Sequence, residues 1–401
     1  MRYLYFNPET DMALALGNKQ YNEPKAITQF KNDLALLPVW YAEEGDCVLL
    51  PEGFDTEFVE SVLSKKIGGL ISVQLMQLSD YKKVSKPDDV LVPWGYNHTL
   101  KKWWQSIGKG QWTVDCDKIR ELSGRNFTID ILENLRSKGF PFSDDFQNPI
   151  AAKSVDDVFQ ILKEREETVL LKMPWSSSGK GLLKIEKDAV KENDLKWVQN
   201  VIDQQGFVIV EKWYDKVLDF ALEFKSHDGI VEYFGSSIFE TENGKYKGNL
   251  LYPESDFEKK LKKKGLEDAE CVILKLKTIL CEFFLTVIPP VYEGYFGVDM
   301  MLMKGKVGET EMVMVHPCVE LNLRTNMGVL TRCFYDKYVE IGKTGMFYIK
   351  TFRTEYDLLD NMAYSCVNNP IKVRKGRVYK GVVAMGIFHH GATTVAYAEI
   401  K

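Results

Sequence analysis

Two oxygen ligands and a cation lie at alternate positions in "VHPCVELNLRTNMG", residues 315–328. Glu320 and Asn322 are two residues apart, so on a strand their side chains point to the same face. A carboxylate beside an amide suits Mg²⁺, which leaves its other positions to water and phosphate. Arg324 continues the alternation, and its planar guanidinium can hold a phosphate or a carboxylate. The segment therefore predicts a magnesium site with a cation next to it.

A third carboxylate, Asp299, interrupts the apolar run "YFGVDMMLM" upstream. A hairpin that turns near residues 305–310 would bring Asp299 within a few residues of a position opposite Glu320. The alternative is that Glu320, Asn322 and Arg324 form an exposed strand edge. A buried carboxylate without a partner is costly, which favours a metal site made by Asp299, Glu320 and Asn322.

A second segment, "LLKMPWSSSGKGLLKI" at 170–185, is rich in the residue types that surround phosphates. It is not a Walker A loop, because Pro174 stands where that motif needs glycine and Gly181 follows Lys180. The flanking residues predict two strands joined by a turn. Such a turn can cradle an anion with its N–H groups, and Lys172 on the incoming strand is within reach. The alternative is an ordinary hairpin turn, in which serine and glycine are common.

The composition is that of a globular protein that is not a general nucleic-acid binder. The chain has 401 residues, a formal net charge of −5 and 45% hydrophobic residues. An acidic balance argues against nucleic-acid partners. The seven cysteines include no CxxC pair, which favours a reduced compartment. We find no signal peptide and no apolar run long enough for a bilayer, so we expect a cytoplasmic protein without membrane contact.

Strand and helix patterns alternate in the first part of the chain, which predicts an open α/β sheet over residues 1–115. Helices are expected at 26–38 and 56–67 within it. After a helix at 127–140, strands dominate, and one long helix is expected over 256–286. The fold class is therefore mixed, α/β followed by α+β.

The order of these motifs resembles the ATP-grasp superfamily, which includes D-alanine–D-alanine ligase, biotin carboxylase and glutathione synthetase. The shared features are a lysine on a strand, a Ser/Gly-rich turn, "VEKW" at a strand end, "GVD" on a later strand and then "ELNLR". The resemblance covers roughly residues 115–335. It implies an ATP-grasp fold behind an N-terminal α/β domain, with segments at 1–115, 116–210 and 211–401.

The resemblance also implies roles for single residues. Lys172 would contact the α- and β-phosphates, and Arg324 would steady the transferring group, as the two catalytic side chains. The flap over the triphosphate would comprise Ser176, Ser177, Ser178, Gly179, Lys180 and Gly181. The adenine hinge would comprise Glu211, Lys212, Trp213 and Tyr214, with Asp219 on the ribose. The family's other phosphate-binding lysine has no direct match; Arg125 stands nearest its place, with Lys118 as the second choice.

The activity that the resemblance implies is an ATP-dependent ligation with one or two Mg²⁺ ions. A small-molecule carboxylate would be activated as an acyl phosphate and then attacked by an amine or similar nucleophile. Two alternatives remain open: a kinase of the same fold that phosphorylates a small molecule, and a nucleotide-binding protein without catalysis. The sequence indicates neither the substrates nor the oligomeric state.

Overall fold

The computed structural model describes residues 1–401 except 55–72, 177–180, 188, 243–244 and 387–388. Within the described residues the strands form three sheets of four, nine and four strands. Each of the three predicted segments holds most of one sheet. The small sheet of the middle segment extends past the expected boundary at residue 210, because its last strand ends at Lys212.

The first sheet is parallel, with the strand order β3-β2-β1-β4. Its strands are β1 (Arg2–Tyr5), β2 (Cys47–Leu50), β3 (Gln74–Gln77) and β4 (Val90–Pro93). The accompanying helices are α1 (Thr10–Ala15), α2 (Lys25–Asp33), the 3-10 helix η1 (Leu37–Trp40), α4 (Leu78–Val84) and α5 (His98–Ile107). The open α/β pattern is confirmed. The helix expected at 56–67 lies outside the described residues.

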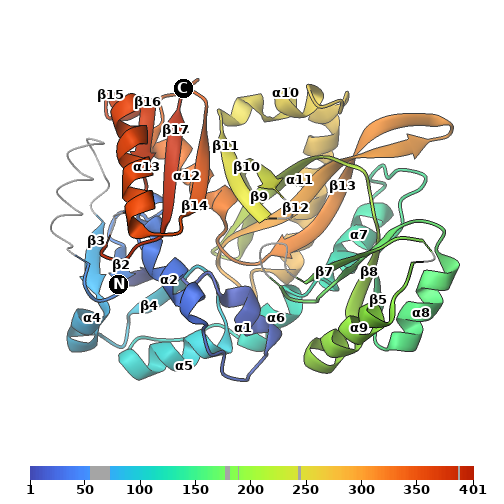
Figure 1. Cartoon of the computed structure of the whole chain (residues 1–401), viewed down its shortest axis with the longest axis horizontal. Helices are drawn as coiled ribbons and strands as arrows, with labels where there is room; N and C mark the ends of the chain where they lie inside the picture. The colour runs from blue at the N-terminus through green and yellow to red at the C-terminus, as the bar shows by residue number, and fades with distance from the viewer. Residues whose placement is uncertain (55–72, 177–180, 188, 243–244, 387–388) are drawn as a thin grey trace.

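Two helices lead from the first sheet to a smaller one, which lies at the lower right of Figure 1. They are α6 (Cys116–Leu122) and α7 (Phe127–Ser137). The small sheet is antiparallel, with the order β5-β8-β6-β7. Its elements are β5 (Ile150–Ala152), α8 (Val155–Glu164), β6 (Val169–Lys172), β7 (Leu182–Ile185), α9 (Glu192–Gln205) and β8 (Val208–Lys212). Val158 of α8 and Val198 and Val201 of α9 are buried against it.

The largest sheet has the order β13-β12-β9-β10-β11-β14-β17-β16-β15. Its strands are β9 (Lys216–His227), β10 (Ile230–Glu242), β11 (Lys245–Leu251), β12 (Gly294–Val307), β13 (Thr310–Asn322), β14 (Gly345–Thr351), β15 (Lys372–Arg374), β16 (Arg377–Ala384) and β17 (Thr394–Ile400). Its helices are η2 (Glu254–Asp256), α10 (Phe257–Lys262), α11 (Ala269–Val287), α12 (Met327–Tyr338) and α13 (Glu355–Asn368). The pairing of β11 with β14 joins the C-terminal strands to the rest.

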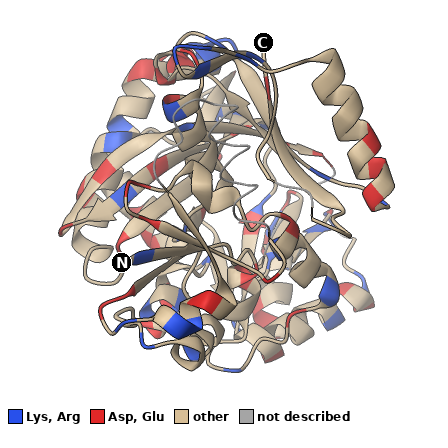
Figure 2. Cartoon of the chain, turned by 90° about the vertical axis from the view of Figure 1, so that its left-hand side faces the viewer, with Lys and Arg blue, Asp and Glu red and all other residues tan. Residues whose placement is uncertain are grey.

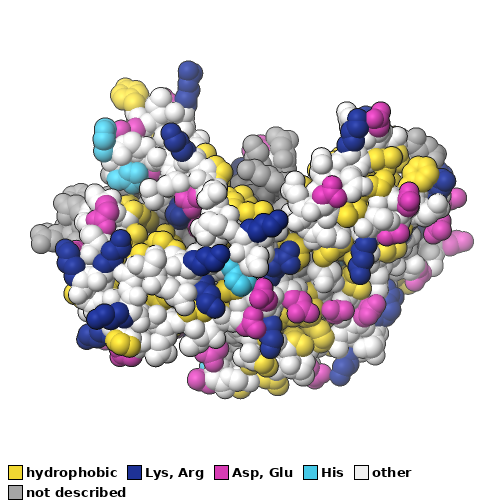
Figure 3. Space-filling view, turned by 90° about the horizontal axis from the view of Figure 1, so that it is seen from below, with side chains coloured by type: hydrophobic (Ala, Val, Ile, Leu, Met, Phe, Trp, Pro, Cys, Tyr) yellow, Lys and Arg dark blue, Asp and Glu magenta, His cyan; other side chains and the backbone are white. Residues whose placement is uncertain are grey.

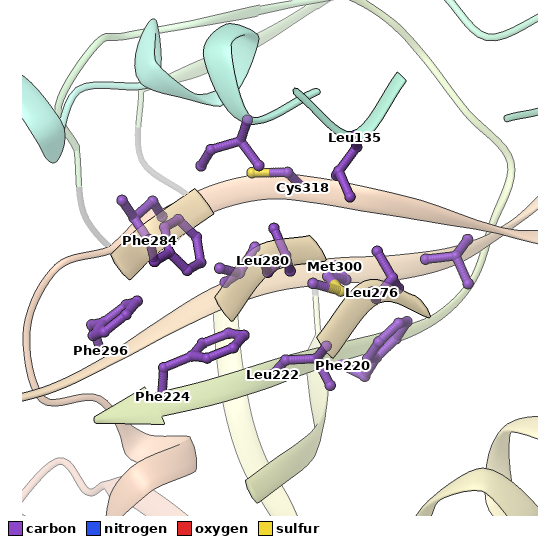
Figure 4. Close-up of a cluster of buried hydrophobic side chains, with 14 of the residues drawn as sticks. Leu135, Phe220, Leu222, Phe224, Leu276, Leu280, Phe284, Phe296, Met300 and Cys318 are labelled. Atoms are coloured by element: carbon purple, nitrogen blue, oxygen red, sulfur yellow. The ribbon is translucent and has the colours of Figure 1, made fainter. Parts of the chain in front are cut away.

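The strand residues that pack under α11 determine which face of the large sheet is left for a site. Figure 4 shows Phe220, Leu222 and Phe224 of β9 gathered with Leu276, Leu280 and Phe284 of α11. Phe296 and Met300 of β12 join the same cluster. Because side chains alternate along a strand, the odd-numbered residues of this part of β9 and β12 point to the other face.

The single long helix expected over 256–286 is wrong. The structure has α10, which ends at Lys262, and α11, which begins at Ala269. Gly265 between them has φ +100, a left-handed conformation that ends a helix and that L-residues rarely adopt. A Cβ there would come within 2.9 Å of Cγ2 of Val313, so the break also lets the chain approach β13 closely.

Charges of both signs are intermingled on the surface. Figure 2 shows Lys and Arg interspersed with Asp and Glu over one side of the chain. The view from below in Figure 3 shows the same mixing, with hydrophobic side chains between the charges. No helix in the described parts of the chain has the length and apolar character needed to cross a membrane.

Candidate active site

Two neighbouring strands, β12 and β13, carry the predicted metal ligands on one face, and β9 lies beside them. Asp299 of β12 is paired with Glu320 of β13 on one side and with Ala221 of β9 on the other. In the next row, Gly297 is paired with Asn322 and with Glu223. The hairpin therefore brings Asp299 to Glu320 as the alternation predicted, with its last paired residues at Val307 and Thr310.

Burial and neighbouring carboxylates disfavour the charged forms of two carboxyl groups in these rows, Asp299 and Glu223. Burial raises the pKa of Asp299 well above its ordinary value, and Glu320 and Glu223 raise it further, whereas Asn322 and Arg324 lower it. Burial likewise raises the pKa of Glu223 to about 7, although the side chains of Asn326 and Ser237 lower it. A cation bound between Asp299 and Glu320 would relieve this repulsion.

The donor set fits Mg²⁺ better than a metal that needs a full protein cage. Within the described ranges, no three His, Cys, Asp or Glu side chains are arranged to hold a metal ion. The predicted set is smaller, two carboxylates and one amide oxygen. Mg²⁺ is commonly held by one or two carboxylates, with waters and phosphate oxygens as its other ligands. The assignment of Asp299, Glu320 and Asn322 remains a prediction.

Lys172 lies at the end of β6, with only 6% of its side chain exposed. Its Nζ forms an ion pair with Oε2 of Glu211 on the neighbouring strand β8. The other carboxylate oxygen of Glu211 lies 3.0 Å from Nε2 of His316, which β13 contributes from the large sheet. Burial would raise the pKa of Glu211, but Lys172 and His316 outweigh it and lower the pKa to about 2. Glu211 is therefore ionised between two nitrogen groups.

Arg125 links the phosphate-loop region to the metal strand. It lies between α6 and α7, and its side chain donates to the carbonyl of Met173 at 2.6 Å and to Oγ of Ser176 at 2.8 Å. Its second terminal nitrogen donates to Oε2 of Glu320 at 2.8 Å. Lys118 is exposed on α6. Of the two candidates for the first phosphate contact, Arg125 is thus the one that lies among the other site residues.

The base of the glycine-rich loop is closed by main-chain contacts. The N–H of Met173 donates to the carbonyl of Gly181 at 2.8 Å. The strands that enter and leave the loop, β6 and β7, pair with each other directly below this contact. Gly181 has φ +76, and a Cβ there would come within 2.8 Å of Sδ of Met173. The strand–turn–strand prediction is confirmed at both ends. Within the predicted flap, Ser177, Ser178, Gly179 and Lys180 lie outside the described residues.

The predicted hinge crosses from the small sheet towards the large one. The N–H of Trp213 donates to the carbonyl of Thr168 at 2.9 Å. In an antiparallel pair the main-chain groups of the preceding residue, Lys212, then point away from β6, to the side of β8 on which β5 pairs. The Lys212 ammonium is held at 2.6 Å by Asp145, and the Tyr214 hydroxyl is held by both main-chain groups of Gln147.

The predicted ribose ligand, Asp219, lies on the same face as the metal row. It is paired with Met301, which is paired in turn with His316. One oxygen of Asp219 accepts from Nζ of Lys216 at 2.6 Å and from Oγ1 of Thr241 at 3.1 Å. Asp219 therefore lies in the same row of the sheet as His316, which contacts Glu211. Its role as a ribose ligand remains a prediction.

Arg324 is already engaged by an N-terminal residue to which the sequence assigned no role. Its guanidinium donates twice to Asp11 of α1, at 3.0 and 2.8 Å. A pocket lies next to this pair, between the first sheet and the end of β13. Its lining residues are Thr10, Asp11, Leu14, Tyr96, Ser123, Trp175, Ser176, Glu320, Leu321, Asn322, Leu323 and Arg324. The pocket adjoins the predicted metal ligands Glu320 and Asn322, and its free volume of about 10 Å³ is that of a single water molecule.

Three site residues were not predicted from the sequence. Glu223 could have been found, because the alternation of Asp219, Ala221 and Glu223 in "DFALEFKS" puts a carboxylate on the site face. His316 and Asp11 gave no such signal, since their partners are distant in sequence.

The chain was compared with known families and structures. No family model and no curated protein matches it. Biotin carboxylase from Campylobacter jejuni, in a β,γ-ATP complex, is 10% identical with a TM-score of 0.50, over 100% of this chain and 87% of that one. N5-carboxyaminoimidazole synthetase from Staphylococcus aureus, complexed with ADP, is 11% identical with a TM-score of 0.49, over 100% and 93% of the two chains. At this identity the first likeness shows the fold: the chain has the ATP-grasp fold behind an N-terminal α/β unit.

Proposed function

We propose that this protein is an ATP- and Mg²⁺-dependent ligase that activates a small-molecule carboxylate as an acyl phosphate for attack by an amine. ATP would lie between the small and large sheets, with its phosphates at Lys172 and Arg125. Mg²⁺ would be held by Asp299, Glu320 and Asn322. The structural neighbour from Campylobacter jejuni, described in a β,γ-ATP complex, supports this choice of nucleotide.

The observation that carries the proposal is the meeting of cations and carboxylates from three separate segments. Arg125 contacts both the loop after Lys172, through Ser176, and the metal strand, through Glu320. Phosphoryl transfer needs this combination, because the charge that spreads over the transferred group is stabilised by fixed cations and a metal rather than by a covalent nucleophile. The contacts to Glu320 and Glu211 are the ones that a nucleotide and its metal would replace or share.

The proposal is tested by ADP release with panels of carboxylates and amines in the presence of ATP and Mg²⁺. Replacement of Glu320 by alanine should abolish release, since it removes a metal ligand and leaves Arg125 without its carboxylate partner. Glu309, an exposed acid in the β12–β13 turn, supplies the matched control as Glu309→Ala. Full activity of Glu320→Ala would exclude the metal assignment.

The two alternatives predict different products from the same assay. A kinase of this fold would release a stable phosphorylated compound, whereas a ligase would release orthophosphate together with the ligated product. A nucleotide-binding protein without catalysis would bind MgADP yet turn over nothing on the panel.

A further inference from the structure

A chain of three buried side chains connects the two sheets behind the predicted phosphate site. Glu211 lies in the middle, with Lys172 on one carboxylate oxygen and His316 on the other. The exposed fractions of the Lys172, Glu211 and His316 side chains are 6%, 5% and 0%. Nε2 of His316 lies 3.0 Å from the Glu211 carboxylate, although the ring is not oriented for a hydrogen bond to it. His316 therefore belongs to the electrostatics of the site.

A phosphate that binds Lys172 draws the ammonium away from Glu211 or shares it. Glu211 would then remain in a water-poor position with a weakened counter-charge, which is costly for a carboxylate. His316 is the second nitrogen group within reach of Glu211, at 3.0 Å. It belongs to the opposite sheet, so it can hold Glu211 while Lys172 turns to the nucleotide.

We propose that His316 is a positioning residue for nucleotide phosphates, which acts by holding Glu211 and, through Glu211, the Lys172 ammonium. The inference rests on the proposed use of ATP. The proposed effect of His316 is on the binding of the phosphates and not of the base, because it acts through Lys172, the predicted phosphate contact. No atom of His316 needs to touch the nucleotide.

The competing role for His316 is packing. Its ring makes edge contacts with Phe146 at 5.0 Å and with Tyr214 at 5.3 Å between centroids. The nearby charges of Lys212 and Asp145 are paired with each other. Phenylalanine at position 316 would keep the aromatic contacts and remove only the nitrogen that faces Glu211, which separates the two roles.

The experiment measures the affinity of wild type, His316→Phe and His316→Gln for MgADP and for adenosine by calorimetry. His316→Phe should weaken MgADP binding roughly tenfold or more, because the ionised Glu211 loses its second nitrogen neighbour, and leave adenosine binding unchanged. His316→Gln, whose amide can donate to Glu211, should recover part of the loss. The control is His390→Phe, at a fully exposed histidine, which should change neither affinity.

A double-mutant cycle with Lys172→Met tests the route of the effect. The two losses in MgADP affinity should be far from additive, because both act through the same ammonium. Additive losses, an equal loss for adenosine, or no loss in His316→Phe would each overturn the proposal. If His316→Phe does not fold, His316→Leu replaces it, with MgADP affinity expected to fall while adenosine affinity holds; unchanged MgADP affinity contradicts the inference. A folded wild type that binds no MgADP refutes the proposed function itself.

Discussion

At the scale of single residues, Glu211 is ionised although it is buried. A buried carboxylate without partners would be protonated more easily than one in water. Burial alone would raise its pKa from the ordinary 4.5, yet Lys172 and His316 lower the pKa to about 2. A carboxyl whose pKa is lower in the folded state stabilises the fold above its unfolded pKa and loses that contribution as pH falls towards the folded value. The relevant window therefore runs from about 4.5 down to about 2.

We predict that Glu211→Gln flattens the acid side of the stability profile. In wild type, a shift of this size corresponds to about 3 kcal/mol of the free energy of unfolding that disappears on acidification through that window. The variant cannot lose this contribution, although it is less stable at neutral pH because Lys172 is left without its carboxylate. Urea unfolding at a series of pH values measures the slope. Glu44→Gln, at an exposed glutamate, is the control and should keep the wild-type slope.

The sequence predicted the residues whose neighbours are close along the chain and missed those that depend on distant contacts. Alternation along two strands was enough to bring Asp299 within a few residues of a position opposite Glu320, and the structure pairs the two residues directly. The contact of Arg125 with Glu320 joins residues 195 apart, and that of Asp11 with Arg324 joins residues 313 apart. No local pattern encodes such pairs, because they depend on how the separate sheets pack together.

At the scale of elements, the β13 strand shows why the row around His316 was hard to predict. Two steps along β12, from Asp299 to Met301, correspond to four steps along β13, from Glu320 to His316. Pro317 lies within this irregularity and has no N–H to donate to a ladder. It is tolerated because β13 is the edge strand of the large sheet. The bulge brings His316 round to Glu211.

The loop between β6 and β7 depends on glycine at its second end. We predict that Gly181→Ala destabilises the fold by about 2 kcal/mol and weakens MgADP binding, because the new methyl group combines left-handed strain with a clash against Met173. Gly206, at the end of α9, is the matched control, since its φ of +93 imposes similar strain but nothing lies within 4 Å. Chemical denaturation and calorimetry of both variants give the comparison. Equal destabilisation in both would show that the clash is relieved without cost.

At the scale of the whole molecule, helix α2 of the N-terminal unit is joined to the start of β17 by a group of polar contacts around Asp33, which we call the clasp. Asp33 at the end of α2 is buried, and its carboxylate accepts from the N–H groups of Thr393 and Thr394 at 3.0 and 2.8 Å. Its other oxygen lies 2.8 Å from Nε2 of His389. The contact with Asp33 raises the pKa of His389 above its ordinary 6.5.

We predict that this clasp makes stability depend on pH near neutrality. A histidine whose pKa is raised in the folded state contributes stability below its unfolded pKa of 6.5, and the contribution is lost as pH rises through the raised value. In wild type, the free energy of unfolding should therefore decline as pH rises above 6.5, by about 1 kcal/mol or less because the pair is partly exposed. His389→Gln should remove this decline. His390→Gln, next to it and fully exposed, should retain the wild-type decline.

The place of β17 in the large sheet has a consequence for synthesis. Residues 394–400 pair with β14 on one side and with β16 on the other, so a strand that is made after both of them fills the position between them. While the ribosome is still adding these residues, β14 and β16 each expose an unpaired edge, the kind of surface on which chains aggregate. The C-terminal half of the sheet can close only after residue 400 has left the exit tunnel. Translation rate and chaperone supply should therefore affect the yield of this protein more than its final stability does.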